Sequence, residues 1–135
     1  MLDFIEVYEG ALAPGACARL VERFMASSGV QPGRVGSGVM PELKDSMDLA
    51  IGQQPGWSDV EAQLNHAVFS GLLSYLRTYP HMLVAPLMLE VPGPDGTRHR
   101  LTPERVAAMD DAALAPIVQA VLRPGAINLQ RYAAG

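Results

Sequence analysis

The sequence predicts an α+β fold in which amphipathic helices pack on a small number of short strands. Its length of 135 residues corresponds to about one domain. Hydrophobic residues make up 49% of the chain and charged residues 18%, which is the composition of a globular protein and not of a disordered one. Segments with apolar residues at helical spacing alternate with short stretches in which polar and apolar residues alternate, and glycine and proline separate them.

The chain is predicted to open with a strand, a short turn and a helix. Residues 4–8 are mostly β-branched and aromatic, which favours a strand. Pro14 fits the first turn of the following helix, where its missing N–H has no partner to lose. Apolar residues then recur at helical spacing, and residues 27–29 end the helix. Cys17 lies on this apolar stripe, so we expect it in the core.

A glycine-rich stretch leads into the next predicted strand. Residues 29–41 do not form a phosphate-binding loop, because the GxGxxG and GK[ST] patterns are missing, so they are interpreted as a flexible loop. Residues 44–51 alternate in the manner of a half-buried strand. Its two faces differ in polarity: Ser46, Asp48 and Ala50 share one side, and Met47, Leu49 and Ile51 share the other.

The clearest element is a helix over residues 58–79. Ser58 and Glu61 match the S-x-x-E capping box, and apolar residues follow the 3.6-residue period until Pro80 stops the helix. Trp57, just before it, is expected to be a packing anchor. His66 lies beside the apolar stripe and is expected to have a structural role.

The following region is less regular. Residues 82–89 are apolar, but Pro86 limits them to an edge strand or an irregular buried segment. A turn is predicted at residues 92–96. Thr102 and Pro103 are expected to start a helix as its N-cap and first residue. Pro116 is expected to split this helical region, and residues 123–125 are expected to end it.

The last segment, residues 126–132, is predicted to be a strand with one polar face. Ile127 and Leu129 point one way, while Asn128, Gln130 and Tyr132 point the other. Amide and phenol groups on one side fit the inner wall of a barrel with a polar interior, although a strand with one face in water has the same pattern. No partner strand is evident from the sequence, yet the N–H and C=O groups of a strand need one.

Charge, cysteine content and hydropathy exclude several classes of protein. The formal net charge is −4, and the basic residues, of which Lys44 is the only lysine, are scattered. This excludes the clustered positive charge that binding to nucleic acid needs. The single cysteine suits a reducing compartment. Neither a signal peptide nor an apolar run long enough to span a membrane is recognisable, so a cytoplasmic protein is expected.

No active site can be assembled from motifs within the chain. His66, His81 and His99 lack the spacing of metal ligands, and no serine lies in a GxSxG elbow. His81 is expected in a loop and His99 in a solvated turn. The neighbouring Asp110 and Asp111 are interpreted as a helix cap or a solvated pair.

Three motifs, in order, resemble a known family. They are the opening residues 4–17, the strand residues 44–49 (K-D-S-M-D-L) and the final residues 127–135 (I-N-L-Q-R-Y-A-A-G). In this order they are similar to the N-terminal part of the iron(II)- and 2-oxoglutarate-dependent oxygenases of the prolyl-4-hydroxylase-like branch. The resemblance implies helices packed on the first strands of a double-stranded β-helix, or jelly roll, with the barrel incomplete in this chain. The chain is then either a single domain or the N-terminal part of a larger oxygenase domain.

The resemblance also implies the chemistry. In the family, two His and one carboxylate hold iron(II) and leave positions for 2-oxoglutarate and oxygen. These ligands are not recognisable here. The HxD motif is expected a few residues beyond Gly135 and the second His further on, so the isolated chain is expected to bind neither iron nor 2-oxoglutarate tightly. Tyr132 resembles the tyrosine that lines the 2-oxoglutarate pocket, and Gln130 is its neighbour on the same strand face. Ser46 and Asp48 match the early motif, either for substrate or for structure.

Two other interpretations remain open. The chain can be a stand-alone, non-catalytic binding or dimerisation module, whose final strand pairs with another chain in a homodimer. It can also be a small α+β domain with an unrelated ligand site between sheet and helices. The substrate of the oxygenase interpretation, a small molecule or a peptide, is not specified by the sequence.

Overall fold

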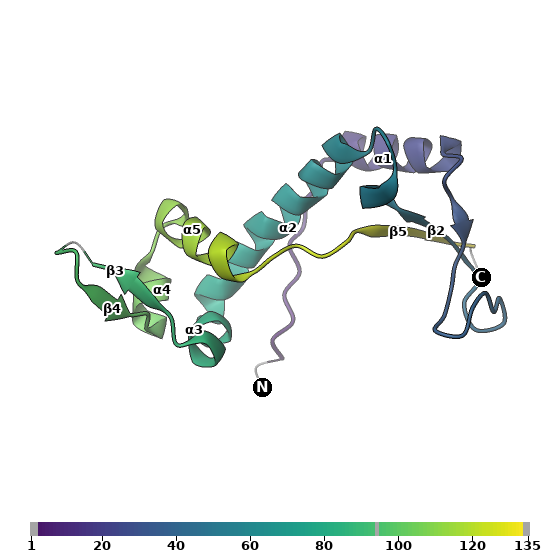
Figure 1. Cartoon of the computed structure of the whole chain (residues 1–135). Helices are drawn as coiled ribbons and strands as arrows, with labels where there is room; N and C mark the ends of the chain where they lie inside the picture. Colours follow the sequence, from purple (N-terminus) through teal and green to yellow (C-terminus); the bar gives the residue numbers. More distant parts are fainter. Residues whose placement is uncertain (1–2, 94, 134–135) are drawn as a thin grey trace. The chain divides into compact units, whose positions relative to one another are not determined.

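The computed structural model describes residues 3–93 and 95–133, and its contacts divide the chain into two compact units (Figure 1). Unit 1 comprises Met1–Ala11 and Ala67–Arg123, and unit 2 comprises Leu12–His66 and Pro124–Gly135. Each unit combines helices with a small antiparallel sheet, which confirms the α+β class. Among the described residues neither sheet closes into a barrel, so the fold observed is the coarser α+β arrangement.

Unit 2 is built on a three-stranded antiparallel sheet in the order β1-β2-β5. In Figure 1 the final strand runs alongside β2, although the two are far apart in the sequence. One core of buried residues covers one face of this sheet: Phe24, Leu49, Ile51, Trp57 and Val60. The elements of unit 2 are α1 (Pro14–Ala26), β1 (Gln31–Pro32), β2 (Ser46–Ala50), the 3₁₀ helix η1 (Ile51–Gln53), the start of α2 (Ser58–Thr78) and β5 (Asn128–Tyr132).

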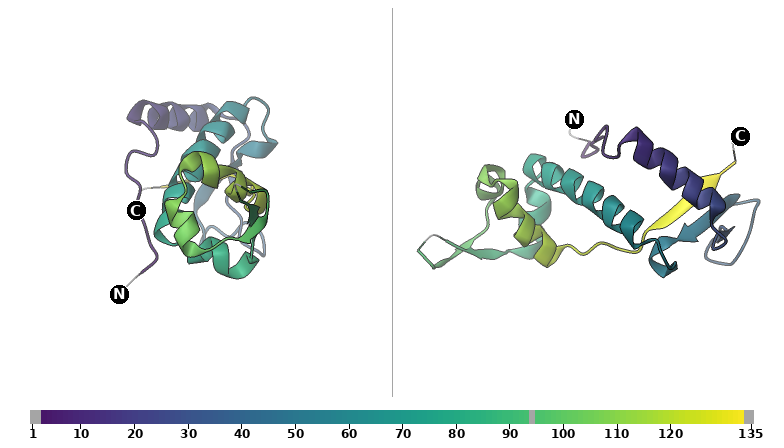
Figure 2. Two further views of the ribbon diagram at one scale, coloured as in Figure 1. Left: turned by 90° about the vertical axis from the view of Figure 1, so that its left-hand side faces the viewer. Right: turned by 90° about the horizontal axis from the view of Figure 1, so that it is seen from above.

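Unit 1 has a separate core formed by the rest of α2 and the elements that follow it. Its buried residues are leucines and valines from four helices and from the end of a β-hairpin: Leu73, Leu76, Leu83, Leu101, Val106, Leu114 and Val118. In the right-hand view of Figure 2 the hairpin reaches outward beyond α5. The further elements of unit 1 are α3 (His81–Leu87), β3 (Glu90–Pro92), β4 (Arg98–Arg100), α4 (Pro103–Ala108) and α5 (Asp111–Val121).

Several predicted elements are confirmed. The helices predicted after Pro14 and over residues 58–79, the strand within 44–51 and the final strand are all present. Trp57 is buried in the core of unit 2, as expected. Thr102 caps α4 by accepting a hydrogen bond from the N–H of Arg105, and Asp110 caps α5 by accepting one from Ala113.

The strand predicted over residues 4–8 is wrong, because the segment lies in no described sheet. Phe4 and Glu6 instead contact tyrosines at the C-terminal end of α2 and just after it. The Tyr75 hydroxyl donates to the carbonyl of Phe4 at 2.8 Å, and the Tyr79 hydroxyl donates to the Glu6 carboxylate at 2.6 Å. The side chains of Phe4 and Glu6, on one side of the segment, thus lie near a helix, whereas Ile5 between them is exposed.

The segment after Pro80 is a helix, and the expected edge strand or irregular segment is a wrong prediction. Pro80 is the N-cap of α3, and Met88 ends the helix in the left-handed conformation, with φ of 46°. Pro86 lies in the last turn, where only the end of this short helix has to accommodate its missing N–H. His81 is thus the first residue of a helix and not a loop residue.

Three smaller expectations are also corrected. The helical region breaks at Met109 and Asp110, while Pro116 is accommodated inside α5. Cys17 is exposed, because α1 buries only a narrow face through Ala16 and Phe24. His66 is exposed as well, so its helix turns it to solvent and no structural role for it is seen.

Candidate functional site

The two polar strand faces predicted from the sequence form one surface. β2 and β5 are antiparallel, and the register places Ser46 opposite Tyr132 and Asp48 opposite Gln130. Directly opposite residues of an antiparallel pair point to the same side of the sheet. The final strand therefore has a partner within the chain, β2, which was not evident from the sequence. This surface, made of Ser46, Asp48, Ala50, Asn128, Gln130 and Tyr132, is called the polar face below.

The apolar residues between these positions hold the polar face in place from behind. Leu49 is fully buried, and Met47, Ile127 and Leu129 pack against the same core. Because side chains alternate along a strand, burying this set turns the intervening polar residues to the other side. The assignment of faces made from the sequence is confirmed for both strands.

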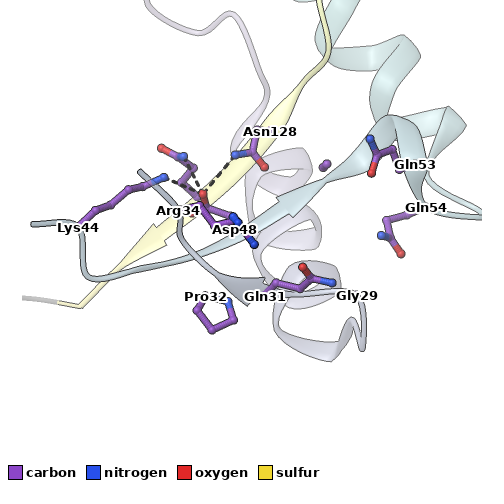
Figure 3. Close-up of a pocket in the computed structure, with 11 residues that line it drawn as sticks. Gly29, Gln31, Pro32, Arg34, Lys44, Asp48, Gln53, Gln54 and Asn128 are labelled. Carbon is purple, nitrogen blue, oxygen red and sulfur yellow. Dashed lines mark hydrogen bonds and ion pairs between the residues drawn. The ribbon is translucent and has the colours of Figure 1, made fainter. Parts of the chain in front are cut away.

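Asp48 is the centre of the polar face (Figure 3). Its Oδ1 accepts a hydrogen bond from the Ser46 hydroxyl at 2.7 Å. Its Oδ2 accepts from the Lys44 ammonium at 2.7 Å, from the Gln130 amide at 3.1 Å and from the Asn128 amide at 3.4 Å. Four donors thus converge on one carboxylate, three of them on Oδ2 and one on Oδ1.

The electrostatic setting of Asp48 follows from these contacts. Partial burial by itself raises the pKa of the carboxyl group, but the hydrogen bonds from Lys44 and Ser46, the charge of Lys44 and the hydrogen bond from Asn128 outweigh it, so the pKa lies below its ordinary value. The Lys44 and Asp48 side chains are 18% and 16% exposed. Asp48 is therefore an ionised anchor with its acceptors occupied, and it is poorly placed to act as a general base.

Ser46 is the buried end of this network. It is 5% exposed, and its carbonyl accepts a hydrogen bond from the N–H of Gly33 at 2.7 Å. A Cβ on Gly33 would lie 2.1 Å from the Ser46 hydroxyl oxygen and 3.2 Å from an Asp48 carboxylate oxygen. The glycine-rich loop can approach the polar face this closely only because residue 33 has no side chain.

Gln130 links Asp48 to Tyr132. The carboxylate accepts hydrogen bonds only, so the NH₂ of Gln130 must face Asp48, and the amide oxygen must face the Tyr132 hydroxyl, which donates to it at 3.2 Å. The Tyr132 hydroxyl therefore uses its one proton to donate to Gln130, and the hydroxyl oxygen of Tyr132 can still accept a hydrogen bond. Tyr132 is 57% exposed, so a ligand can reach this oxygen.

A cavity of about 470 Å³ opens over part of the polar face (Figure 3). The sequence pointed to its floor, but not to the residues of its walls. Those walls come from the loop that includes the glycine-rich stretch and from the segment after β2, where no periodicity marks residues that share a surface. The lining residues that sequence reasoning missed are Gln31, Arg34, Gln53, Gln54 and Asn128, the last being noted on the strand face but not chosen as a site residue.

The iron site implied by the resemblance does not fit the residues present. Among residues 3–93 and 95–133, no group of three or more His, Cys, Asp or Glu side chains is arranged to hold a metal ion. His66 and His81 are exposed, while His99 contacts Thr97 and Asp95 within the β3–β4 hairpin. The described part of the chain supplies the polar face and its cavity, but not a two-His-one-carboxylate triad.

Comparison with known proteins gives no relative from which a function can be transferred. No protein-family model, no curated protein and no solved structure matches the chain. Every helix of the described residues is too short or too polar to cross a membrane. The functional argument therefore rests on the geometry of the polar face.

Proposed function

We propose that this chain forms the helical support and first strands of an iron(II)- and 2-oxoglutarate-dependent oxygenase of the prolyl-4-hydroxylase-like branch. In this proposal the polar face is part of the inner wall of a double-stranded β-helix. The observation that carries it is the pairing of β2 with β5. Two of the three motifs that resemble the family thereby become neighbouring strands, with their polar residues on one side.

The pairing supports the proposal because the motifs are distant in the chain. Asp48 and Gln130 are separated by 82 residues, yet they are opposite each other and hydrogen-bonded. A barrel with a polar interior needs strands that are polar on the inner side and apolar on the outer side. β2 and β5 have this character, and the apolar side is covered by the core of unit 2.

The residues of the polar face have different roles in this proposal. Tyr132 offers an accessible phenol oxygen at the position that resembles the 2-oxoglutarate pocket, and its hydroxyl donates a hydrogen bond to Gln130. Asp48 is a positioning residue, since its acceptors are occupied by Ser46, Lys44 and the two amides. The described residues supply no iron triad, so the proposal requires two His and one carboxylate in a continuation of the polypeptide beyond Gly135.

The test is turnover by the polypeptide translated through its whole reading frame. With iron(II), ascorbate and oxygen, we expect 2-oxoglutarate to be converted to succinate. Tyr132→Phe is expected to raise the KM for 2-oxoglutarate several-fold with a smaller change in kcat, while Tyr8→Phe, in unit 1, leaves both unchanged. A reading frame without an HxD motif after Gly135, or a full-length protein that makes no succinate, contradicts the proposal.

A second candidate function has one observation in its favour. β5 is the last strand in the order β1-β2-β5, so the ladder with β2 uses only one of its edges. The other edge can pair with a strand of a second copy, which is the dimerisation alternative. Light scattering after size exclusion distinguishes the two. A dimer that Asn128→Pro converts to monomer favours this candidate, because the N–H of Asn128 points away from β2 toward the free edge. A well-folded wild-type monomer removes it.

A further inference from the structure

The cavity over the polar face carries a net positive charge, although the whole chain carries −4. The charged groups that line it are Arg34, Lys44 and Asp48. Lys44 and Asp48 form an ion pair at 2.7 Å and cancel each other. None of the ion pairs found within residues 3–93 and 95–133 includes Arg34, so its guanidinium is the uncompensated charge of the cavity.

The carboxylate of Asp48 does not oppose the entry of an anion. Its oxygens accept hydrogen bonds from four donors, and one of the two nearest, both at 2.7 Å, is the Lys44 ammonium. A ligand carboxylate near Arg34 therefore meets a neutral pair and a free guanidinium, and the planar guanidinium can bind it through two parallel hydrogen bonds.

The other polar groups that line the cavity are mainly side-chain amides. Asn128 and Gln130 use their NH₂ groups on Asp48. Gln31, Gln53 and Gln54 add three further amides, each with a donor and an acceptor. Groups of this kind match the C=O and N–H of an amide bond in a ligand.

We propose that this cavity binds a ligand with a carboxylate next to an amide bond, as found in an N-acylated amino acid or at the C-terminus of a peptide. Arg34 binds the carboxylate, and the glutamines contact the amide. That this ligand is the substrate rests on the proposed oxygenase function, whereas its binding to the cavity does not.

The experiment is an NMR titration of the 135-residue chain with N-acetylglycine, without iron. We expect saturable shifts of the backbone amides of Gln31, Arg34 and Gln54, and no such shifts with the neutral analogue N-acetylglycinamide. Arg34→Gln is expected to weaken binding about tenfold, because it removes the charged partner. Arg19→Gln, an exposed arginine of unit 2 outside the cavity, is the matched control and leaves binding unchanged.

N-acetyl-triglycine distinguishes the two sources of the ligand: tighter binding than N-acetylglycine indicates a peptide, and equal binding indicates a small N-acylated amino acid. The inference is overturned if no saturable shifts occur, if the neutral analogue binds equally, or if Arg34→Gln has no effect. It is also overturned if 2-oxoglutarate displaces N-acetylglycine from the same resonances. Because no iron is involved, failure here leaves the succinate test of the proposed function unaffected.

Discussion

Asp48 and Gln130 lie directly opposite each other in neighbouring antiparallel strands, and the Gln130 amide donates to the Asp48 carboxylate at 3.1 Å. The same carboxylate oxygen is 2.7 Å from the Lys44 ammonium. The backbone hydrogen bonds between β2 and β5 and the side-chain network around Asp48 therefore both hold these two strands together. Removing the carboxylate should affect both the stability of unit 2 and the orientation of its polar face.

Asp48→Asn is expected to destabilise unit 2 by about 1–3 kcal/mol, because the new NH₂ group faces donors and leaves Lys44 without its charged partner. Urea unfolding followed by fluorescence measures this, since Trp57 is the single tryptophan and lies in the core of unit 2. Asp59→Asn is the control: it breaks an exposed ion pair with Arg23, which solvent screens, so a clearly smaller cost is expected. Equal costs for the two variants would contradict the role given to Asp48.

The contribution of Asp48 to the stability of the folded chain should decrease at acid pH. The pKa of its carboxyl group in the folded chain lies below the ordinary value of 3.8. Such a group stabilises the folded state fully above the unfolded pKa, and this stabilisation is lost as the pH falls through the folded pKa. The difference in stability between the wild type and Asp48→Asn should therefore shrink below about pH 4. A difference that stays constant from pH 6 to pH 2.5 would show that the charge of Asp48 is not responsible.

Gly33→Ala is expected to destabilise unit 2 by about 1–3 kcal/mol, because the added Cβ would displace the buried Ser46 hydroxyl from Asp48. Gly36→Ala is the matched control, since a Cβ there meets no atom within 4 Å. Introducing Gly33→Ala into a Ser46→Ala background should cost clearly less than in the wild type, because the clashing oxygen is gone. If the cost is the same in both backgrounds, the contact with Ser46 is not the cause.

Tyr79 should titrate at unusually high pH. The hydrogen bond to Glu6, followed by burial and by the negative charges of Glu6 and Asp3, raises the pKa of Tyr79 to about 12. Glu6→Gln removes the main charge and is expected to lower this pKa by about one unit or more. NMR of ¹³C-labelled tyrosine, with Tyr79→Phe for assignment, measures it, and Glu9→Gln should leave it unchanged. An ordinary pKa in the wild type would show that residues 4–8 do not rest on α2 in solution.

The parts of the fold that depend on local pattern could be predicted from the sequence. The alternation around Leu49 and Leu129 correctly assigned both strand faces, and the helical period correctly placed α2. Register and partners depend on contacts between distant residues, which no local pattern encodes. For this reason the pairing of Asp48 with Gln130 was not predicted, and residues 4–8, which have the pattern of a strand, were assigned one although they rest on a helix.

The candidate site divides in the same way. Its floor could be predicted, because Ser46, Asp48 and Gln130 lie on strands with a clear alternation. Its walls could not, because Arg34 and Gln54 lie in irregular segments that only the folded chain brings over the sheet. One signal was present in the sequence: a run of glycines permits close approach of a loop to another element, as Gly33 does with Ser46.

The most direct test of the central claim is the amount of succinate formed from 2-oxoglutarate by the full reading-frame product and by its Asp48→Asn variant. If the polar face is the wall of an oxygenase site positioned by Asp48, the wild type forms succinate in an iron-dependent manner. The variant, at a temperature where circular dichroism shows it folded, then forms it about tenfold more slowly. Absence of succinate from the wild type, or equal rates for both proteins, would contradict the account.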